Sequence, residues 1–308
     1  MAKPTIGIAL GSGAARGWSH IGVLQVLGDE GIEPDIVCGC SMGALVGAAY
    51  IADELDAMEK WARSMSWREM ADLIDIDLTS GGLIEGKRIM GFLQSMREDA
   101  PIESFEKRFT AIATDLMTGR EIWLEQGSVV DAVRASIALP GIFSPVKLNG
   151  KWLLDGGLVN PVPVSAARAR GADIIIAVNL NGGLVGKHIH PQLAQSRDAA
   201  KRPAAVEMLN SLFDKMPKTI SKSLKHLAPD ILGANDKTPD YFDVGATAIN
   251  IMQDQITRAR LAGEPPHVMI SPQLADLKIL DFNRAEEAIE EGRRVTKHAL
   301  PAIRELLD

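Results

Sequence analysis

The chain has 308 residues, of which 46% are hydrophobic and 24% are charged, so it has enough apolar side chains for a sizeable core. This composition excludes disordered and fibrous proteins, and the net charge of -7 argues against a nucleic-acid partner. The longest apolar run, at 174–178, is far shorter than the roughly 20 residues of a membrane-spanning helix.

The N-terminal region predicts two successive units of strand, loop and helix. A β-branched apolar run at 5–10 precedes a glycine-rich loop, and apolar residues then recur at helical spacing over 18–30. A second strand at 35–39 leads into a helix of small residues at 42–52. Two such units predict parallel strands that are joined by a right-handed crossover.

The remaining chain continues to alternate strands and helices. Strands are expected at 109–114, 121–124, 152–154, 173–180 and 267–270, and helices at 86–97, 129–138, 164–170, 242–261 and 284–307. This alternation predicts an α/β fold with a mainly parallel central sheet flanked by helices. The reactive groups of such sheets lie in loops at the carboxyl ends of strands.

Residues 184–237 interrupt this alternation, with nine Lys or Arg against five Asp or Glu. Because a strand and a helix follow it, we interpret this segment as a basic helical insertion in a single domain spanning 1–308. On a helical wheel, Lys215, Lys218, Lys222 and Lys225 lie opposite Met216, Ile220, Leu224 and Leu227. Such a helix fits a lid that docks on an anionic membrane, and it equally fits ordinary packing on the domain.

The sequence GCSMG at 39–43 lies between a predicted strand and a predicted helix. Gly39 and Gly43 leave room for a tight turn that presents Ser41 at the positive end of the helix. Ser41 is therefore a candidate nucleophile, and the alternative is a serine that only caps the helix.

A second glycine-rich loop, GSGAARG at 11–17, follows the first strand. Backbone N–H groups at the start of a helix bind anions, and the anion in acyl transfer is the tetrahedral oxyanion. A dinucleotide-binding turn is the alternative. The spacing disfavours it, because Arg16 stands where the third glycine of that motif is expected.

The third motif, DGG at 155–157, follows a short predicted strand. The Asp155 carboxylate can act as the base for a serine hydroxyl if its surroundings raise its pKa. A plain Asp-Gly turn is the alternative.

Histidine is the more usual base, but none of the six has a persuasive setting. His188, His190 and His226 lie in the basic insertion, His267 at the start of a predicted strand and His298 in the last helix. His20, which precedes Asp155, is expected to be structural.

Taken together, the three motifs resemble those of the patatin-like phospholipases, in particular compact bacterial members related to the neuropathy-target-esterase branch. The resemblance covers most of the chain and includes the segments 18–24, 136–145 and 160–163. It implies a serine acyl hydrolase with a Ser-Asp dyad, acting on phospholipid or lysophospholipid without a catalytic histidine, a metal or an organic cofactor.

The resemblance also implies roles for individual residues. These are Ser41 as nucleophile, Asp155 as base, the N–H groups of Gly13, Ala14 and Ser12 as oxyanion hole, Gly11, Arg16 and Gly17 as loop support, and Gly39, Gly43, Gly156 and Gly157 as turn glycines. The family usually has glycine where Ser12 and Ala14 stand, which leaves the identity of the donors open. Segment 136–145 either shapes the acyl pocket or forms a structural turn.

Two other functional classes stay open at this point: a regulatory or lipid-sensing protein with an incidental dyad, and a dinucleotide-binding oxidoreductase. Residues 1–12 lack the features of a secretory signal, so we expect a cytoplasmic protein, with peripheral contact with the inner membrane surface left open. Cys38 and Cys40 are expected to be reduced and buried, and they are too few for a metal cage. The oligomeric state is not indicated.

Overall fold

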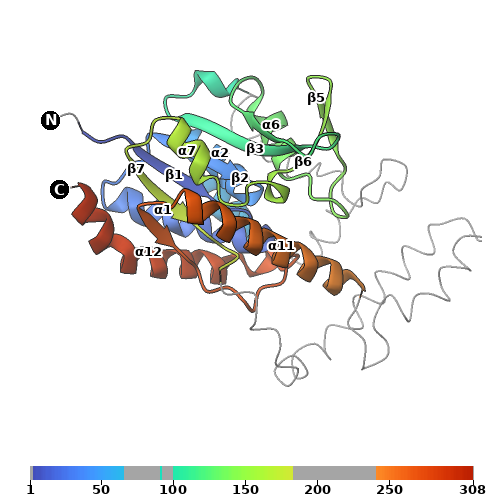
Figure 1. The fold of residues 1–308 in the computed structure, drawn as a ribbon. Coiled ribbons are helices and arrows are strands. Elements are labelled where there is room, and N and C mark those ends of the chain that lie inside the picture. The colour runs from blue at the N-terminus through green and yellow to red at the C-terminus, as the bar shows by residue number, and fades with distance from the viewer. Residues whose placement is uncertain (1–2, 66–90, 92–99, 183–240, 308) are drawn as a thin grey trace, which may run out of the picture. The chain divides into compact units, whose positions relative to one another are not determined.

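The computed structural model describes residues 3–65, 91, 100–182 and 241–307 (Figure 1). The chain divides into two units, one comprising 1–182 and 253–308 and the other 183–252. The first unit contains the sheet and all candidate site residues. The insertion predicted at 184–237, with its lysine-bearing helix, lies outside the described residues, as does nearly all of the helix predicted at 86–97.

The sheet has eight strands: β1 Ile6–Leu10, β2 Ile36–Cys40, β3 Arg108–Asp115, β4 Glu121–Leu124, β5 Val146–Leu148, β6 Lys151–Asp155, β7 Ile174–Val178 and β8 Val268–Ile270. Seven of them follow the order β5-β6-β3-β2-β1-β7-β8, and β4 pairs with β3. The strands from β3 to β8 along this order are parallel, while β4, β5 and β6 pair antiparallel. The mainly parallel sheet is thus confirmed.

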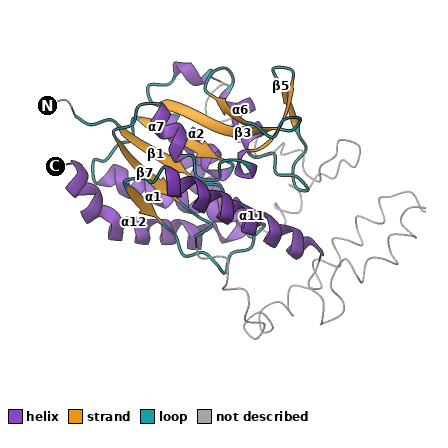
Figure 2. Ribbon diagram, viewed as in Figure 1, coloured by secondary structure: helices purple, strands orange, loops and turns teal. Residues whose placement is uncertain are grey.

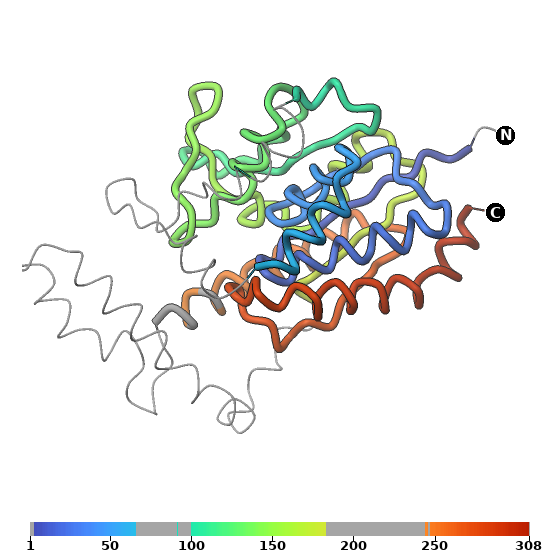
Figure 3. The backbone as a smooth tube through the Cα atoms, turned by 180° about the vertical axis from the view of Figure 1, so that it is seen from behind, coloured from blue at the N-terminus to red at the C-terminus, as the bar shows by residue number. Residues whose placement is uncertain are grey.

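The described helices are α1 Ser19–Asp29, α2 Met42–Ile51, α3 Leu55–Ser64, α6 Val129–Ser136, α7 Val164–Ala169, α11 Tyr241–Gly263 and α12 Ala285–Leu307. They lie on both faces of the sheet (Figure 2). Alternate residues of β1 belong to the two cores on opposite faces of the sheet. Ile8 and Leu10 pack on the face of α1, α2 and α12, and Ala9 packs on the face of α7. Figure 3 shows α1 and α12 side by side on the first face. No described helix is both long and apolar enough to cross a bilayer.

The pairing of β3 positions the ends of β2 and β6. β4 occupies one edge of β3, and β2 occupies the other edge as far as the pair of Cys40 with Ile112. Beyond that pair, β6 occupies the same edge of β3, starting with the pair of Ala113 and Asp155. The residue after Cys40 therefore meets the last residue of β6. Cys38 and Cys40 themselves are buried and free, as predicted.

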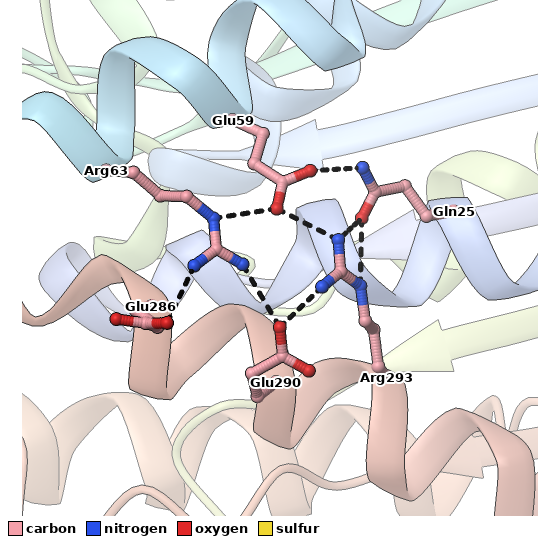
Figure 4. Close-up of polar contacts among 6 residues, drawn as sticks. All are labelled: Gln25, Glu59, Arg63, Glu286, Glu290 and Arg293. Atoms are coloured by element: carbon pink, nitrogen blue, oxygen red, sulfur yellow. Dashed lines mark hydrogen bonds and ion pairs between the residues drawn. The ribbon is translucent and has the colours of Figure 1, made fainter.

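A polar network joins α1, α3 and α12 (Figure 4). Glu59 of α3 accepts hydrogen bonds from Gln25 (2.6 Å), Arg63 (2.8 Å) and Arg293 (2.9 Å). Glu290 of α12 pairs with the same two arginines. The two carboxylates and two guanidinium groups thus link α3 to α12.

We expect Glu59→Gln to lower the free energy of unfolding by about 1 kcal/mol, because two arginines lose their shared charged acceptor. Urea unfolding measures this change, with Glu286→Gln as the control, because that side chain is 81% exposed and contacts Arg63 alone in the network.

The effect of Glu59→Gln should depend on pH. Burial raises the pKa of Glu59, but the bonds from Gln25, Arg63 and Arg293 outweigh it and hold the pKa below its ordinary 4.5. The stabilisation is therefore present above that value and is lost as the pH falls through the lowered pKa. Equal stability of Glu59→Gln and wild type at neutral pH would contradict a stabilising network.

Candidate active site

Ser41 occupies a strained turn between β2 and α2. Its φ of 55° and ψ of -122° lie in a region that residues other than glycine rarely adopt, at a cost of about 1–3 kcal/mol. The Ser41 N–H donates to Ser136 Oγ (2.9 Å), and the Ser136 hydroxyl donates to the carbonyl of Ile112 (2.6 Å). The buried end of α6 thus fixes the turn to β3. Sequence analysis did not assign this role to Ser136.

The glycines around Ser41 allow the backbone to pack closely. A Cβ on Gly43 would lie 2.1 Å from the carbonyl oxygen of Leu10, and one on Gly39 would lie 2.5 Å from that of Gly43. Neither contact leaves room for a side chain. The first turn of α2 therefore packs directly on the end of β1, as a tight turn at Ser41 requires.

The structure brings Ser41 and Asp155 together across 114 positions of sequence. Ser41 Oγ donates to Asp155 Oδ2 at 2.6 Å. The other carboxylate oxygen accepts the N–H of Gly157 at 2.7 Å. The main chain of Asp155 is also held, because its N–H donates to the carbonyl of Ala138 and its own carbonyl accepts from Thr114 Oγ1. Asp155 therefore presents one fixed oxygen to the serine.

Burial raises the pKa of Asp155 to about 6, against the hydrogen bonds from Ser41 and Gly157, which lower it. A carboxylate with this pKa is mostly ionised at neutral pH, yet it is a stronger base than an exposed aspartate. The site thus contains a serine hydroxyl whose hydrogen bond points to a group able to accept its proton.

The loop at 11–17 lies against the segment that follows Ser41. A Cβ on Gly17 would lie 2.3 Å from that of Met42. In the described part of the chain, neither the N–H of Gly13 nor that of Ala14 has a hydrogen-bond partner, so both can bind an anion. Ser12 departs from the expected pattern, because its N–H already donates to the carbonyl of Pro161 (2.8 Å).

Arg16 supports this loop from within. Its side chain is buried, and both its Nε–H (3.1 Å) and its backbone N–H (3.2 Å) donate to the carbonyl of Gly13. Nη2 reaches Asn181 Oδ1 at 3.4 Å. Burial lowers the pKa of Arg16 to about 10, so the guanidinium stays charged at neutral pH. It fixes the orientation of the peptide unit that follows Gly13.

Two buried amides that sequence analysis missed connect the loop to the rest of the site. Gln253 Oε1 accepts from Ser12 Oγ (3.2 Å) and from Asn181 Nδ2 (3.1 Å). Its Nε2 fills the space beside Gly157, where a Cβ would lie 2.4 Å away. Gln253 therefore joins the glycine loop, the segment after β7 and the turn of Asp155. No local motif signals a contact across 241 positions.

We expect Gln253→Ala to lower kcat for a soluble short-chain ester about tenfold with little change in KM, because the loop loses the bond that positions it. Gln255→Ala is the matched control, since that glutamine lies on the same helix and is exposed. Steady-state kinetics measure both variants. An unchanged kcat in a folded Gln253→Ala protein would show that the amide has no positioning role.

None of the three described histidines is hydrogen-bonded to Ser41 or Asp155. Their ring nitrogens instead bond to main-chain groups: His20 to the carbonyl of Gly11, His267 to the N–H of Ile175 and His298 to the carbonyl of Arg294. Burial lowers the pKa of His20 to about 4, so that ring is neutral. His188, His190 and His226 lie outside the described residues.

Comparison with known proteins identifies the family. The model of the family described as patatin-like phospholipase matches residues 8–168. An uncharacterized NTE family protein of Mycobacterium bovis is 31% identical over 98% of this chain and 92% of its own length. Lysophospholipase NTE1 of Yarrowia lipolytica is 35% identical over 57% of this chain and 12% of its own length. Patatin-like phospholipase domain-containing protein 6 of Mus musculus is 32% identical over 57% of this chain and 13% of its own length.

These matches argue against the dinucleotide-binding alternative for the glycine loop. That loop belongs to the matched region, as do both Ser41 and Asp155. The chain is therefore a member of the patatin-like phospholipase family and a lipid hydrolase.

Proposed function

We propose that the chain is a serine acyl hydrolase that cleaves fatty-acyl esters of phospholipids or lysophospholipids through Ser41 and Asp155. The observation that carries this proposal is the 2.6 Å hydrogen bond from Ser41 Oγ to Asp155 Oδ2. The family supports a lipid substrate, and the name of the yeast relative supports a lysophospholipid.

In the first half-reaction, Ser41 Oγ attacks the carbonyl carbon of the ester while its proton passes to Asp155 Oδ2. The carbonyl oxygen becomes an oxyanion, to which the N–H groups of Gly13 and Ala14 donate, and the positive end of α2 adds to this stabilisation. The bond to the leaving alcohol then breaks. The alcohol oxygen takes the proton from Asp155, and the acyl group stays on Ser41.

In the second half-reaction, a water molecule attacks the acyl carbonyl and gives its proton to Asp155. The bond between Ser41 Oγ and the acyl carbon breaks, Ser41 takes back the proton, and the fatty acid leaves. One carboxylate thus serves as base and acid in each half-reaction. Its raised pKa suits both tasks near neutral pH.

Reaction with a fluorophosphonate probe, followed by peptide mapping, tests this proposal. We expect the label on Ser41 in the native protein, because only an activated serine attacks the probe at a useful rate. Urea-unfolded protein is the control and should stay unlabelled. A label on another residue, or no label on native protein, would contradict the nucleophile assignment.

A further inference from the structure

Three large apolar side chains near the end of the sheet are exposed. Leu116 and Met117, in the turn after β3, are 46% and 79% exposed, and Trp152 on β6 is 44% exposed. Met117 is the most exposed large hydrophobic residue in the described part of the chain. We refer to Leu116, Met117 and Trp152 as the apolar patch.

The strand register places two residues of this patch, Leu116 and Trp152, on one face together with a lysine. The N–H of Leu116 donates to the carbonyl of Trp152 (2.8 Å), which extends the pairing of β3 with β6 by one residue. Trp152 in turn pairs with Lys147 of β5. Opposed residues of antiparallel strands share a face, so these three side chains form a row. Lys147 Nζ lies 5.9 Å from the centroid of the Trp152 ring.

The segments that hold the patch carry only positive charge. Residues 116–120 and 146–152 contain Arg120, Lys147 and Lys151, all exposed, and no Asp or Glu. The acidic residues that flank the first segment already have partners. Asp115 accepts the N–H of Met117 and interacts with the positive charge of Lys151, and Glu121 pairs with Arg260 at 2.6 Å.

We infer that the apolar patch and Lys147 dock the enzyme on an anionic phospholipid surface, an inference that rests on the proposed function. An exposed methionine and an amphipathic tryptophan beside a lysine suit a membrane interface. Methionine and tryptophan would also suit a protein partner, but the lysine beside them favours the membrane, because lysine is depleted from protein interfaces. The site is close by, since Trp152 and Asp155 are three residues apart on β6, or about 10 Å. β5 forms the edge of the sheet there (Figure 1).

Vesicle sedimentation with full-length Ser41→Ala protein tests the inference without digestion of the lipid. We expect binding to vesicles of phosphatidylcholine with phosphatidylglycerol, and roughly tenfold weaker binding after Met117→Ser with Trp152→Ser. The change Lys147→Gln should lower the preference over vesicles of phosphatidylcholine alone. Leu306→Ser, at a site on α12 that is 39% exposed, is the control and should bind as the parent does.

Several outcomes would overturn the docking inference. They are absence of binding by the parent protein, parent-like binding of the patch variants, and an equal loss in Leu306→Ser. Loss only in a variant with Lys215, Lys218, Lys222 and Lys225 changed to Gln would assign docking to the predicted basic helix instead. Circular dichroism checks folding, and Met117→Ser alone replaces the double variant if that is unfolded. Hydrolysis of a soluble ester by wild type tests the proposed function separately, because it needs no vesicle.

Discussion

We expect Ser41→Ala and Asp155→Asn each to lower kcat for a soluble short-chain ester by about a thousandfold or more, because the proposed nucleophile and base act as one unit. Ser41→Ala removes the attacking oxygen. Asp155→Asn keeps the shape of the side chain but leaves no group that can take the proton. Its amide oxygen can still accept from Gly157, and its NH₂ can donate to Ser41 Oγ, so the geometry survives while the chemistry stops. Steady-state kinetics on folded protein measure both losses.

Histidine variants are the controls for this result. His298→Ala, which changes an exposed side chain bonded to its own helix, should keep wild-type turnover. Replacing His188, His190 or His226 singly should also leave kcat within a few-fold of wild type. A folded but inactive histidine variant would restore a triad, and near-wild-type turnover by Asp155→Asn would remove the dyad. Ester turnover retained by Ser41→Ala would show that another residue is the nucleophile.

The sequence signals of the candidate site residues are local. The glycines around Ser41 and after Asp155 are needed by the backbone itself, so they mark the two turns in the sequence. What brings the turns together is not local. β6 takes over the edge of β3 where β2 ends, and no spacing in the sequence states that Ala113 pairs with Asp155.

The elements that were missed are short or weakly apolar. β5 has three residues, too few to show an alternating pattern. In α3, Met58 and Ala62 are buried and Leu55 and Trp61 are only partly buried against the core, and charged residues stand between them. The role of Gln253 depends on contacts between distant segments, which a single sequence does not reveal. The same holds for Ser12, whose N–H is occupied by a carbonyl that lies far along the chain.

The exposed patch illustrates a further limit. The apolar residues at 152–154 predict a strand, but they do not say which face a neighbouring helix covers. Leu154, on the same face as Trp152, is buried, whereas Trp152 is exposed because it lies two residues nearer the hairpin end of β6. Exposure at this end is therefore a property of the assembled sheet.

The pH dependence of kcat/KM should follow Asp155, rising tenfold per pH unit below about 6 and levelling off above it. The protonated carboxyl cannot accept the Ser41 proton, so activity requires ionisation. An imidazole base would give a similar curve, but its midpoint would shift strongly with temperature, whereas the ionisation of a carboxyl group has a small enthalpy. A midpoint near 4, or one that moves with temperature as an imidazole does, would contradict a buried aspartate base.

The same ionisation should make activity and stability oppose each other. Because the folded-state pKa of about 6 lies above the ordinary 3.8, the contribution of Asp155 to stability is complete below about 4 and is lost as the pH rises through 6. Asp155→Asn removes this dependence, and we expect it to be more stable than wild type by about 2 kcal/mol at pH values above the raised pKa. Urea unfolding of both proteins across this range measures the difference. If wild type were the more stable protein at neutral pH, burial of the Asp155 carboxylate would not cost stability. The raised pKa would then need a cause other than burial.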